Sequence, residues 1–219
     1  MTGRCTPISC WNPPDTVPAP RAILIWAALA VAIVLPVAVA ARSPLLQWRE
    51  PVYIIAGLAG VIGMALILLQ PLLAGGYLPG LPALRGRGLH RWIGAALVLA
   101  VIIHVGGLWI TSPPDVIDAL LFVSATPFSV WGVIAMWAIF ATALLAVLRS
   151  RRTLGPRAWR LGHSALALVI VIGTVIHALL IQGTMGQISK IILSGLVIAA
   201  TVKALADLRA WAMLRRRKG

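Results

Sequence analysis

Six long apolar runs dominate this sequence and limit the kind of structure it can form. The runs are Ala22–Ala41, Val52–Leu73, Leu89–Ile110, Phe128–Leu148, Leu161–Ile181 and Ile188–Ala206. Each holds about 20 residues, which is the length of helix that crosses the hydrocarbon core of a bilayer. Only 11% of the residues are charged, whereas soluble domains carry about 25%. An ordinary water-soluble fold is therefore excluded, and the sequence predicts an all-α membrane protein, a bundle of six transmembrane helices.

The regions outside these runs are short. Residues 1–21 are rich in proline and have no apolar period, so we expect a disordered cytoplasmic tail. Residues 22–211 form the predicted transmembrane domain, and residues 212–219 form a basic cytoplasmic tail. Cys5 and Cys10 both lie in the first tail, and their spacing matches no metal motif.

The cations predict the orientation of the chain. The formal net charge is +14, but the Lys and Arg residues form short clusters between the apolar runs. With the N-terminus inside, only Arg42, Arg49 and Lys190 fall on the outer side. The positive-inside rule therefore predicts that both termini are cytoplasmic. We expect a multi-pass protein of the bacterial inner (plasma) membrane. Its expected partner is the lipid bilayer, and we expect no nucleic-acid partner.

All four histidines lie in predicted spans. His90 and His104 are on the third span and His163 and His177 on the fifth, so each pair is separated by 14 positions. Fourteen helical residues turn through about 1400°, about 40° short of four full turns, and rise about 21 Å. The two spans run in the same direction. We therefore expect His90 to lie level with His163, and His104 level with His177.

Two imidazoles that face each other across a helix bundle suit a heme iron with histidine in both axial positions. Zinc or copper requires three or four ligands on one centre. We expect two hemes b with these four histidines as iron ligands, a cofactor set suited to electron transfer. Intramembrane histidines can also serve helix packing. The alternative is a heme-free transporter subunit or assembly factor.

The stretches that carry the histidines resemble a known family. LHRWIGAALVLAVIIH (Leu89–His104) and WRLGHSALALVIVIGTVIH (Trp159–His177) are similar to the ferric reductase-like transmembrane domain, which occurs in ferric reductases and NADPH oxidases. The resemblance implies an inner heme on His90 and His163 and an outer heme on His104 and His177. Electrons would then move from the cytoplasm outward, through the electron-transfer subunit of an oxidoreductase system.

The partners follow from what the chain is expected to lack. Only a short basic tail follows Asp207, so we expect no flavin or nicotinamide domain. FAD or FMN and NAD(P)H would then act only through a separate partner. A cytoplasmic flavoprotein reductase or a quinol is the expected donor, and the acceptor on the outer side is left open.

Two further features lie near the histidines. Arg91 and Arg160 flank the inner pair, and we expect them to bind heme propionates, because guanidinium groups bind carboxylates. The alternative is that they only anchor the spans at the inner surface. Glycines recur every three residues at Gly57, Gly60 and Gly63 and indicate a closely packed helix face.

Overall fold

The computed structural model describes residues 19–151 and 155–216, and these residues contain helices and no strand. The elements are α1 (Ala19–Ala41), η1 (Pro44–Leu46), α2 (Pro51–Ala74), α3 (Ala83–Thr111), α4 (Pro113–Leu120), α5 (Ser129–Ser150), α6 (Pro156–Leu180) and α7 (Gln187–Arg216). Within this part of the chain, six helices are long and apolar enough to cross a membrane, and only the short α4 is not. The all-α fold with six spans is confirmed, and the chain is a multi-pass membrane protein.

Three helices extend well beyond the apolar runs that predicted them. α3 begins at Ala83 rather than Leu89, α6 begins at Pro156 rather than Leu161, and α7 continues past Ala206 to Arg216. Each extension contains two or three arginines, which lower the hydropathy but are good helix formers. Apolar length thus marks the part of a helix within the bilayer, while the helix itself continues beyond it. Residues 1–18, with Cys5 and Cys10, and residues 217–219 lie outside the described part of the chain.

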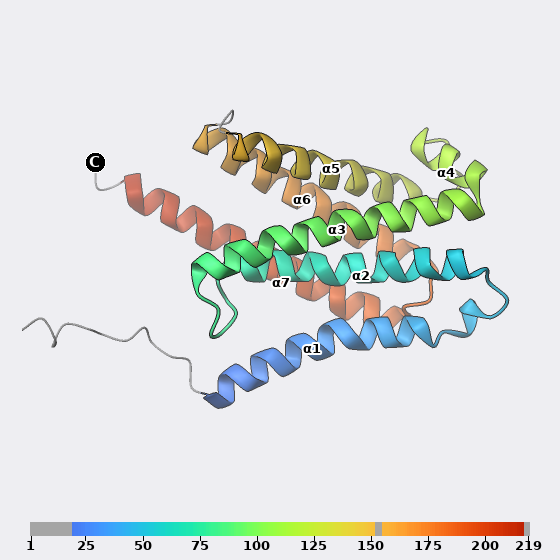
Figure 1. Ribbon diagram of the computed structural model, residues 1–219, viewed down its shortest axis with the longest axis horizontal. Coiled ribbons are helices and arrows are strands. Elements are labelled where there is room, and N and C mark those ends of the chain that lie inside the picture. The colour runs from blue at the N-terminus through green and yellow to red at the C-terminus, as the bar shows by residue number, and fades with distance from the viewer. Residues whose placement is uncertain (1–18, 152–154, 217–219) are drawn as a thin grey trace, which may run out of the picture.

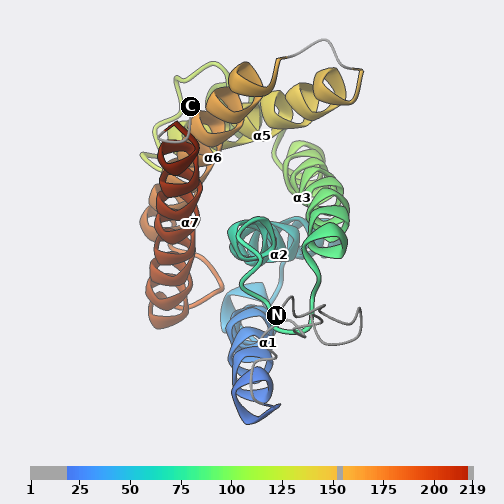
Figure 2. The same ribbon diagram turned by 90° about the vertical axis from the view of Figure 1, so that its left-hand side faces the viewer.

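The helices are arranged around α2. Figure 2 shows α2 at the centre, with α1, α3 and α7 on its different sides and the α5–α6 pair beyond them. The most extensive contacts join α2 to α3 and α5 to α6. Each of these is an antiparallel pair joined by a short connection (Figure 1). The short helix α4 links the two pairs at one end of the bundle.

The apolar side chains divide between a core and an outer surface. Leu193 and Val197 of α7 are fully buried and belong to a cluster with residues of α2, α5 and α6. In contrast, Leu24, Ile110 and Leu161 are about 70% exposed. A soluble protein rarely exposes large contiguous apolar surfaces. These faces therefore pack against lipid.

The loop between α2 and α3 is attached to two other helices. The hydroxyl of Tyr77 donates a hydrogen bond to Asp207 of α7, and Lys203 Nζ lies 3.2 Å from the same carboxylate. Lys203 also lies 4.8 Å from the centre of the Tyr77 ring. The indole nitrogen of Trp26 in α1 donates to the carbonyl oxygen of Pro79 at 3.3 Å. Polar contacts of this loop thus join α1, α2, α3 and α7 at one end of the bundle.

A buried lysine organises the loop between α6 and α7. Lys190 is only 3% exposed, and its Nζ donates to the carbonyl oxygen of Ile181, just after the last residue of α6. A cation at this position satisfies a carbonyl group that the helix leaves free and interacts favourably with the helix dipole. Lys190 therefore fixes the course of the connection from α6 to α7.

The hydrogen bond from Tyr77 to Asp207 predicts that the attachment of the α2–α3 loop to α7 weakens at alkaline pH. Desolvation and the carboxylate of Asp207 raise the pKa of Tyr77 to about 12, from an ordinary value of 10.0. A group whose pKa is raised by folding stabilises the folded state below its ordinary pKa. The stabilisation is lost as the pH rises through the raised value. The stabilisation that the contact provides should thus be complete below about pH 10 and be lost as the pH rises from about 10 to about 12.

The titration can be followed by phenolate absorbance. The chain has two tyrosines, so Tyr53→Phe leaves Tyr77 as the only reporter. In this background Tyr77 should titrate with a raised pKa, and adding Asp207→Asn should move that pKa back towards 10.0. Equal pKa values in the two proteins would show that the carboxylate does not act on Tyr77.

Candidate cofactor site

Four histidines from α3 and α6 form two facing pairs in the bundle. The ring centroids of His90 and His163 are 6.0 Å apart, with an interplanar angle of 69°. The ring centroids of His104 and His177 are 6.5 Å apart, with an interplanar angle of 82°. The structure thus brings together the same partners that the equal spacing on parallel helices predicts. The pairs lie at two levels of the bundle, because 14 residues of helix rise about 21 Å.

The separation of the rings suits a single metal ion between them. Bonds between a metal ion and an imidazole nitrogen are about 2.0–2.1 Å long, and a metal held between two such nitrogens leaves the ring centroids about 6 Å apart. Both observed separations agree with this value. The residues described contain no group of three or more His, Cys, Asp or Glu side chains that could hold a metal ion. The pairs therefore suit an ion whose remaining ligands come from a macrocycle such as heme.

Hydrogen bonds set the orientation of three of the four rings. The Nδ1 atom of His90 lies 3.2 Å from the carbonyl oxygen of Gln70, and that of His104 lies 2.7 Å from the carbonyl oxygen of Ala56. The Nδ1 atom of His177 lies 2.9 Å from the carbonyl oxygen of Phe128. Because a carbonyl oxygen only accepts, each Nδ1 carries the hydrogen and donates it. The Nε2 atom of each ring then keeps its lone pair for a metal.

Two glycines make room for one of the pairs. A Cβ atom on Gly60 of α2 would lie 2.9 Å from Nδ1 of His104, and one on Gly132 of α5 would lie 2.7 Å from Nδ1 of His177. Real Cβ atoms essentially never approach so closely. Each glycine comes four residues after the residue whose carbonyl accepts the hydrogen bond. The same arrangement, a carbonyl acceptor followed four residues later by a glycine under the imidazole, therefore occurs in both antiparallel pairs.

The helix backbones also approach each other closely in both antiparallel pairs. A Cβ atom on Gly107 of α3 would lie 2.7 Å from Cβ of Ala56, and one on Gly173 of α6 would lie 2.9 Å from the carbonyl oxygen of Trp131. The absence of side chains at these positions lets α2 contact α3, and α5 contact α6, at short range. This close contact brings the carbonyl groups of α2 and α5 within hydrogen-bond distance of the imidazoles.

His163 has a different environment from the other three histidines. Its Nδ1 atom is buried and has no hydrogen-bond partner among the residues that the structure describes. The ring instead stacks on the indole of Trp159, one turn earlier in α6, with centroids 4.9 Å apart and planes 18° from parallel. The Oε1 atom of Gln70, near the same pair, is also buried and has no partner in the described part of the chain. The two pairs are therefore chemically distinct.

The structure leaves Arg91 and Arg160 outside these contacts. Both side chains are exposed, on the turns that carry His90 and His163. Their predicted role with propionates stays a prediction. Sequence reasoning missed Gly132 and the stacking of Trp159. The repeat of Gly57, Gly60 and Gly63 indicated close packing, but only the structure shows that Gly60 faces an imidazole.

A comparison with known protein families identifies a match for most of the chain. Residues 26–174 match the family model described as ferric reductase like transmembrane component. The match covers more than half of the chain and includes His90, His104 and His163, and it ends three residues before His177. No curated protein and no solved structure matches the chain.

The space beside His104 can be tested with a matched pair of variants on α2. Gly60→Ala should lower the free energy of unfolding by about 1–3 kcal/mol, because the new methyl group overpacks the site against His104. Gly57→Ala has no atom within 4 Å of the added Cβ and should be neutral or stabilising by up to about 1 kcal/mol. Thermal unfolding in detergent measures both. Equal transition temperatures would contradict the close approach.

Proposed function

The chain belongs to the ferric reductase-like transmembrane family, and on this premise we propose that it carries electrons across a membrane through two hemes b. Each heme is held between one histidine of α3 and one of α6. The observation that carries the proposal is the pairing of four imidazoles at separations that fit one metal ion per pair. The family supports membrane electron transfer as the general activity.

The residues of the chain prepare each site for iron. A heme iron bound by two histidines would supply one-electron chemistry, since it would leave no open position for oxygen or substrate. His90, His104 and His177 donate Nδ1–H to backbone carbonyl groups, which fixes the plane of each ring and makes Nε2 a better ligand. Trp159 fixes the plane of His163 by stacking. Contacts within the protein thus orient all four rings.

The charges support a direction for electron transfer. The end of the bundle on the left of Figure 1 carries the start of α3, the end of α5 and the start of α6. These segments contain Arg85, Arg87, Arg91, Arg149, Arg151, Arg157 and Arg160. By the positive-inside rule this end is cytoplasmic, and both termini are on the same side. The pair His90–His163 is then the inner site and the pair His104–His177 the outer site.

The donor and acceptor follow from this orientation. Electrons enter at the inner site from a cytoplasmic flavoprotein reductase or a quinol and leave from the outer site to an acceptor outside the cytoplasm. We place the protein in the bacterial inner membrane. Arg91 and Arg160 are close enough in sequence to the inner ligands to bind propionates. Lower heme retention in Arg91→Ala and Arg160→Ala tests this role against simple anchoring.

Single substitutions of the histidines test the proposed cofactor sites. His90→Ala and His163→Ala should remove the same heme, and His104→Ala and His177→Ala should remove the other. Reduced-minus-oxidised visible spectra with heme quantified per chain measure the loss. Thr142→Ala is a matched control, because it removes a polar group inside the bundle whose hydroxyl donates to the carbonyl oxygen of Ala138 in its own helix. This control should keep the full heme content.

A second set of variants distinguishes loss of an iron ligand from misfolding. His104→Gly and His177→Gly leave space for free imidazole, which should restore the lost heme signal when added during reconstitution. Full heme content in all four alanine variants would refute the assignment. A colourless wild-type protein after expression with ample heme would instead favour the heme-free alternative.

The stacking of Trp159 on His163 predicts that substitution of Trp159 changes the midpoint potential of one heme and not of the other. Trp159→Ala should shift the midpoint potential of the heme that His163→Ala removes, because the plane of His163 is no longer fixed. The potential of the other heme should stay unchanged. Trp137→Ala is the control, because it removes another indole of the bundle, one whose ring contact is with Phe140 rather than with a histidine. Redox titration followed by visible absorbance measures both potentials, and equal shifts of both hemes would contradict a local effect.

A further inference from the structure

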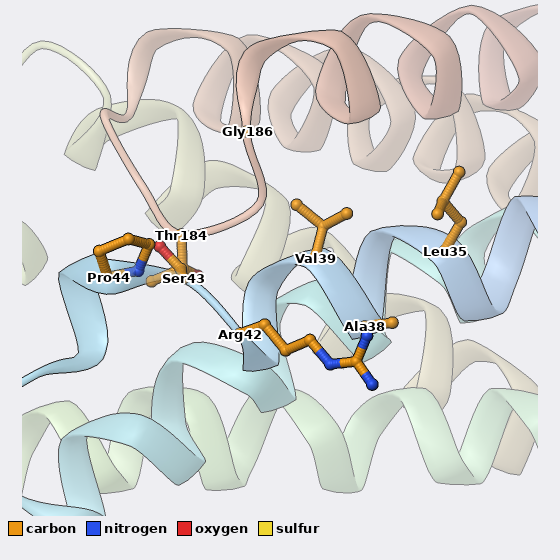
Figure 3. A pocket seen from close by; sticks show the side chains of 8 residues that line it. All are labelled: Leu35, Ala38, Val39, Arg42, Ser43, Pro44, Thr184 and Gly186. Carbon is orange, nitrogen blue, oxygen red and sulfur yellow. The ribbon is translucent and has the colours of Figure 1, made fainter.

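A cavity of about 470 Å³ lies beyond the candidate cofactor site, where the end of α1 meets η1 and the loop between α6 and α7 (Figure 3). Its lining residues are Leu35, Ala38, Val39, Arg42, Ser43, Pro44, Thr184 and Gly186. Small-molecule sites commonly have volumes of about 300–1,000 Å³. The cavity thus has the size of a binding site and opens at one end of the transmembrane bundle.

The wall formed by the α6–α7 loop is held in place by the protein. Lys190 bonds the carbonyl oxygen of Ile181, and its backbone nitrogen donates to the carbonyl oxygen of Gly186 at 3.2 Å. Met185 of the loop is buried. Gly186 has a φ angle of +71°, a backbone conformation that side chains with a Cβ rarely adopt. The chain therefore reaches Thr184 and turns back to α7 along a defined path.

The opposite wall is apolar at one end and polar at the other. Leu35 and Val39 lie on α1 within the membrane span, and both are partly exposed. Arg42 and Ser43 follow the end of the helix, and Thr184 lies beside Ser43 in Figure 3. Figure 3 shows the guanidinium of Arg42 turned back along α1 beside Ala38. An amphiphile can match this gradient, with its chain along α1 and its headgroup at Arg42.

Arg42 is a cation without a protein partner. Of the three basic residues expected at this end, Arg49 lies 5.0 Å from the ring of Tyr53 and Lys190 bonds Ile181. Within residues 19–151 and 155–216, no ion pair or side-chain hydrogen bond joins Arg42 to another group. A guanidinium group with unused donors is suited to bind a phosphate through two parallel hydrogen bonds.

A second cavity has a purely apolar lining and serves as a comparison for the first. It has a volume of about 310 Å³ and lies between α2 and α3. Its lining residues are Val52, Ile55, Ile102, Ile103, Gly106, Gly107 and Ile110. This lining offers only dispersion contacts to an acyl chain. The charge and hydroxyl groups of the first cavity therefore distinguish it from a gap that any lipid tail fills.

We propose that the first cavity is a binding site for an anionic phospholipid. The phosphodiester accepts hydrogen bonds from the guanidinium of Arg42, one acyl chain packs against Leu35 and Val39, and the rest of the headgroup lies against Ser43 and Thr184. The lipid then connects α1 to the α6–α7 loop. This connection matters because α1 is the least buried span: only 6% of its most apolar stretch is buried within the protein.

The test is retention of defined lipids by the detergent-purified full chain, measured by native mass spectrometry. Phosphatidylglycerol should be retained in preference to phosphatidylethanolamine. Arg42→Gln should weaken retention of phosphatidylglycerol about tenfold, because a hydrogen-bonded charge is lost. Ala38→Phe fills the cavity without changing the charge and should have a similar effect. Arg49→Gln, which removes a cation on the same side of the protein, should retain the lipid as the wild type does.

Each other outcome overturns the proposal. Equal losses in Arg42→Gln and Arg49→Gln would indicate diffuse attraction of lipid to charge rather than a site. Equal retention of the two lipids by the wild type would remove the role of the anionic headgroup. Displacement of phosphatidylglycerol by an excess of inorganic phosphate would identify an anion site that does not need the acyl chain. Thermal unfolding confirms that each variant is folded before the lipids are compared.

Discussion

The register between antiparallel neighbours is the constraint on which the histidine pairs depend. His104 donates to the carbonyl group of Ala56, and His90, fourteen residues back along α3, donates to Gln70, fourteen residues further along α2. Both hydrogen bonds can form at once only if the register between α2 and α3 is the same at His90 and at His104. Gly107 permits the close contact of the two helices, and Gly60 leaves room for the ring of His104. A backbone carbonyl thus orients both imidazoles of α3.

The second antiparallel pair repeats this arrangement at one end and departs from it at the other. His177 donates to Phe128 of α5 and lies over Gly132, as His104 lies over Gly60. Fourteen residues from Phe128 along α5 is Thr142, but among the described residues the Nδ1 atom of His163 has no hydrogen-bond partner, and its ring stacks on Trp159. One pair of rings is therefore fixed by two hydrogen bonds, and the other by one hydrogen bond and one stacking contact. Such a difference would give the two proposed cofactors different properties.

The sequence predicts the spans and the partners of the histidines because both depend on periodicity. Apolar length determines which segments cross the membrane, and equal spacing on two parallel helices determines that His90 meets His163. The same information underestimates α3, which begins at Ala83, because arginines in its first turns lower the hydropathy without stopping the helix. Local chemistry thus determines the ends of the helices less sharply than their apolar centres.

The remaining features of the site have weaker signals in the sequence. A carbonyl acceptor such as that of Ala56 is present at every residue, so sequence cannot single it out. Trp159 precedes His163 by four residues, a spacing that puts both side chains on one face of a helix, but the same position is that of an ordinary interfacial tryptophan. Likewise, Lys190 has the position of an ordinary interfacial cation. The structure shows that the rings of Trp159 and His163 stack and that Lys190 is buried.

The presence of two cofactors per chain is the central claim, and quantifying heme in the purified wild-type protein tests it most directly. Extraction of the heme into alkaline pyridine, together with amino-acid analysis of the same sample, gives the ratio of heme b to polypeptide. The paired histidines predict a ratio of two. A ratio of one would show that only one of the pairs binds heme, and a ratio of zero from cells supplied with heme would contradict the account.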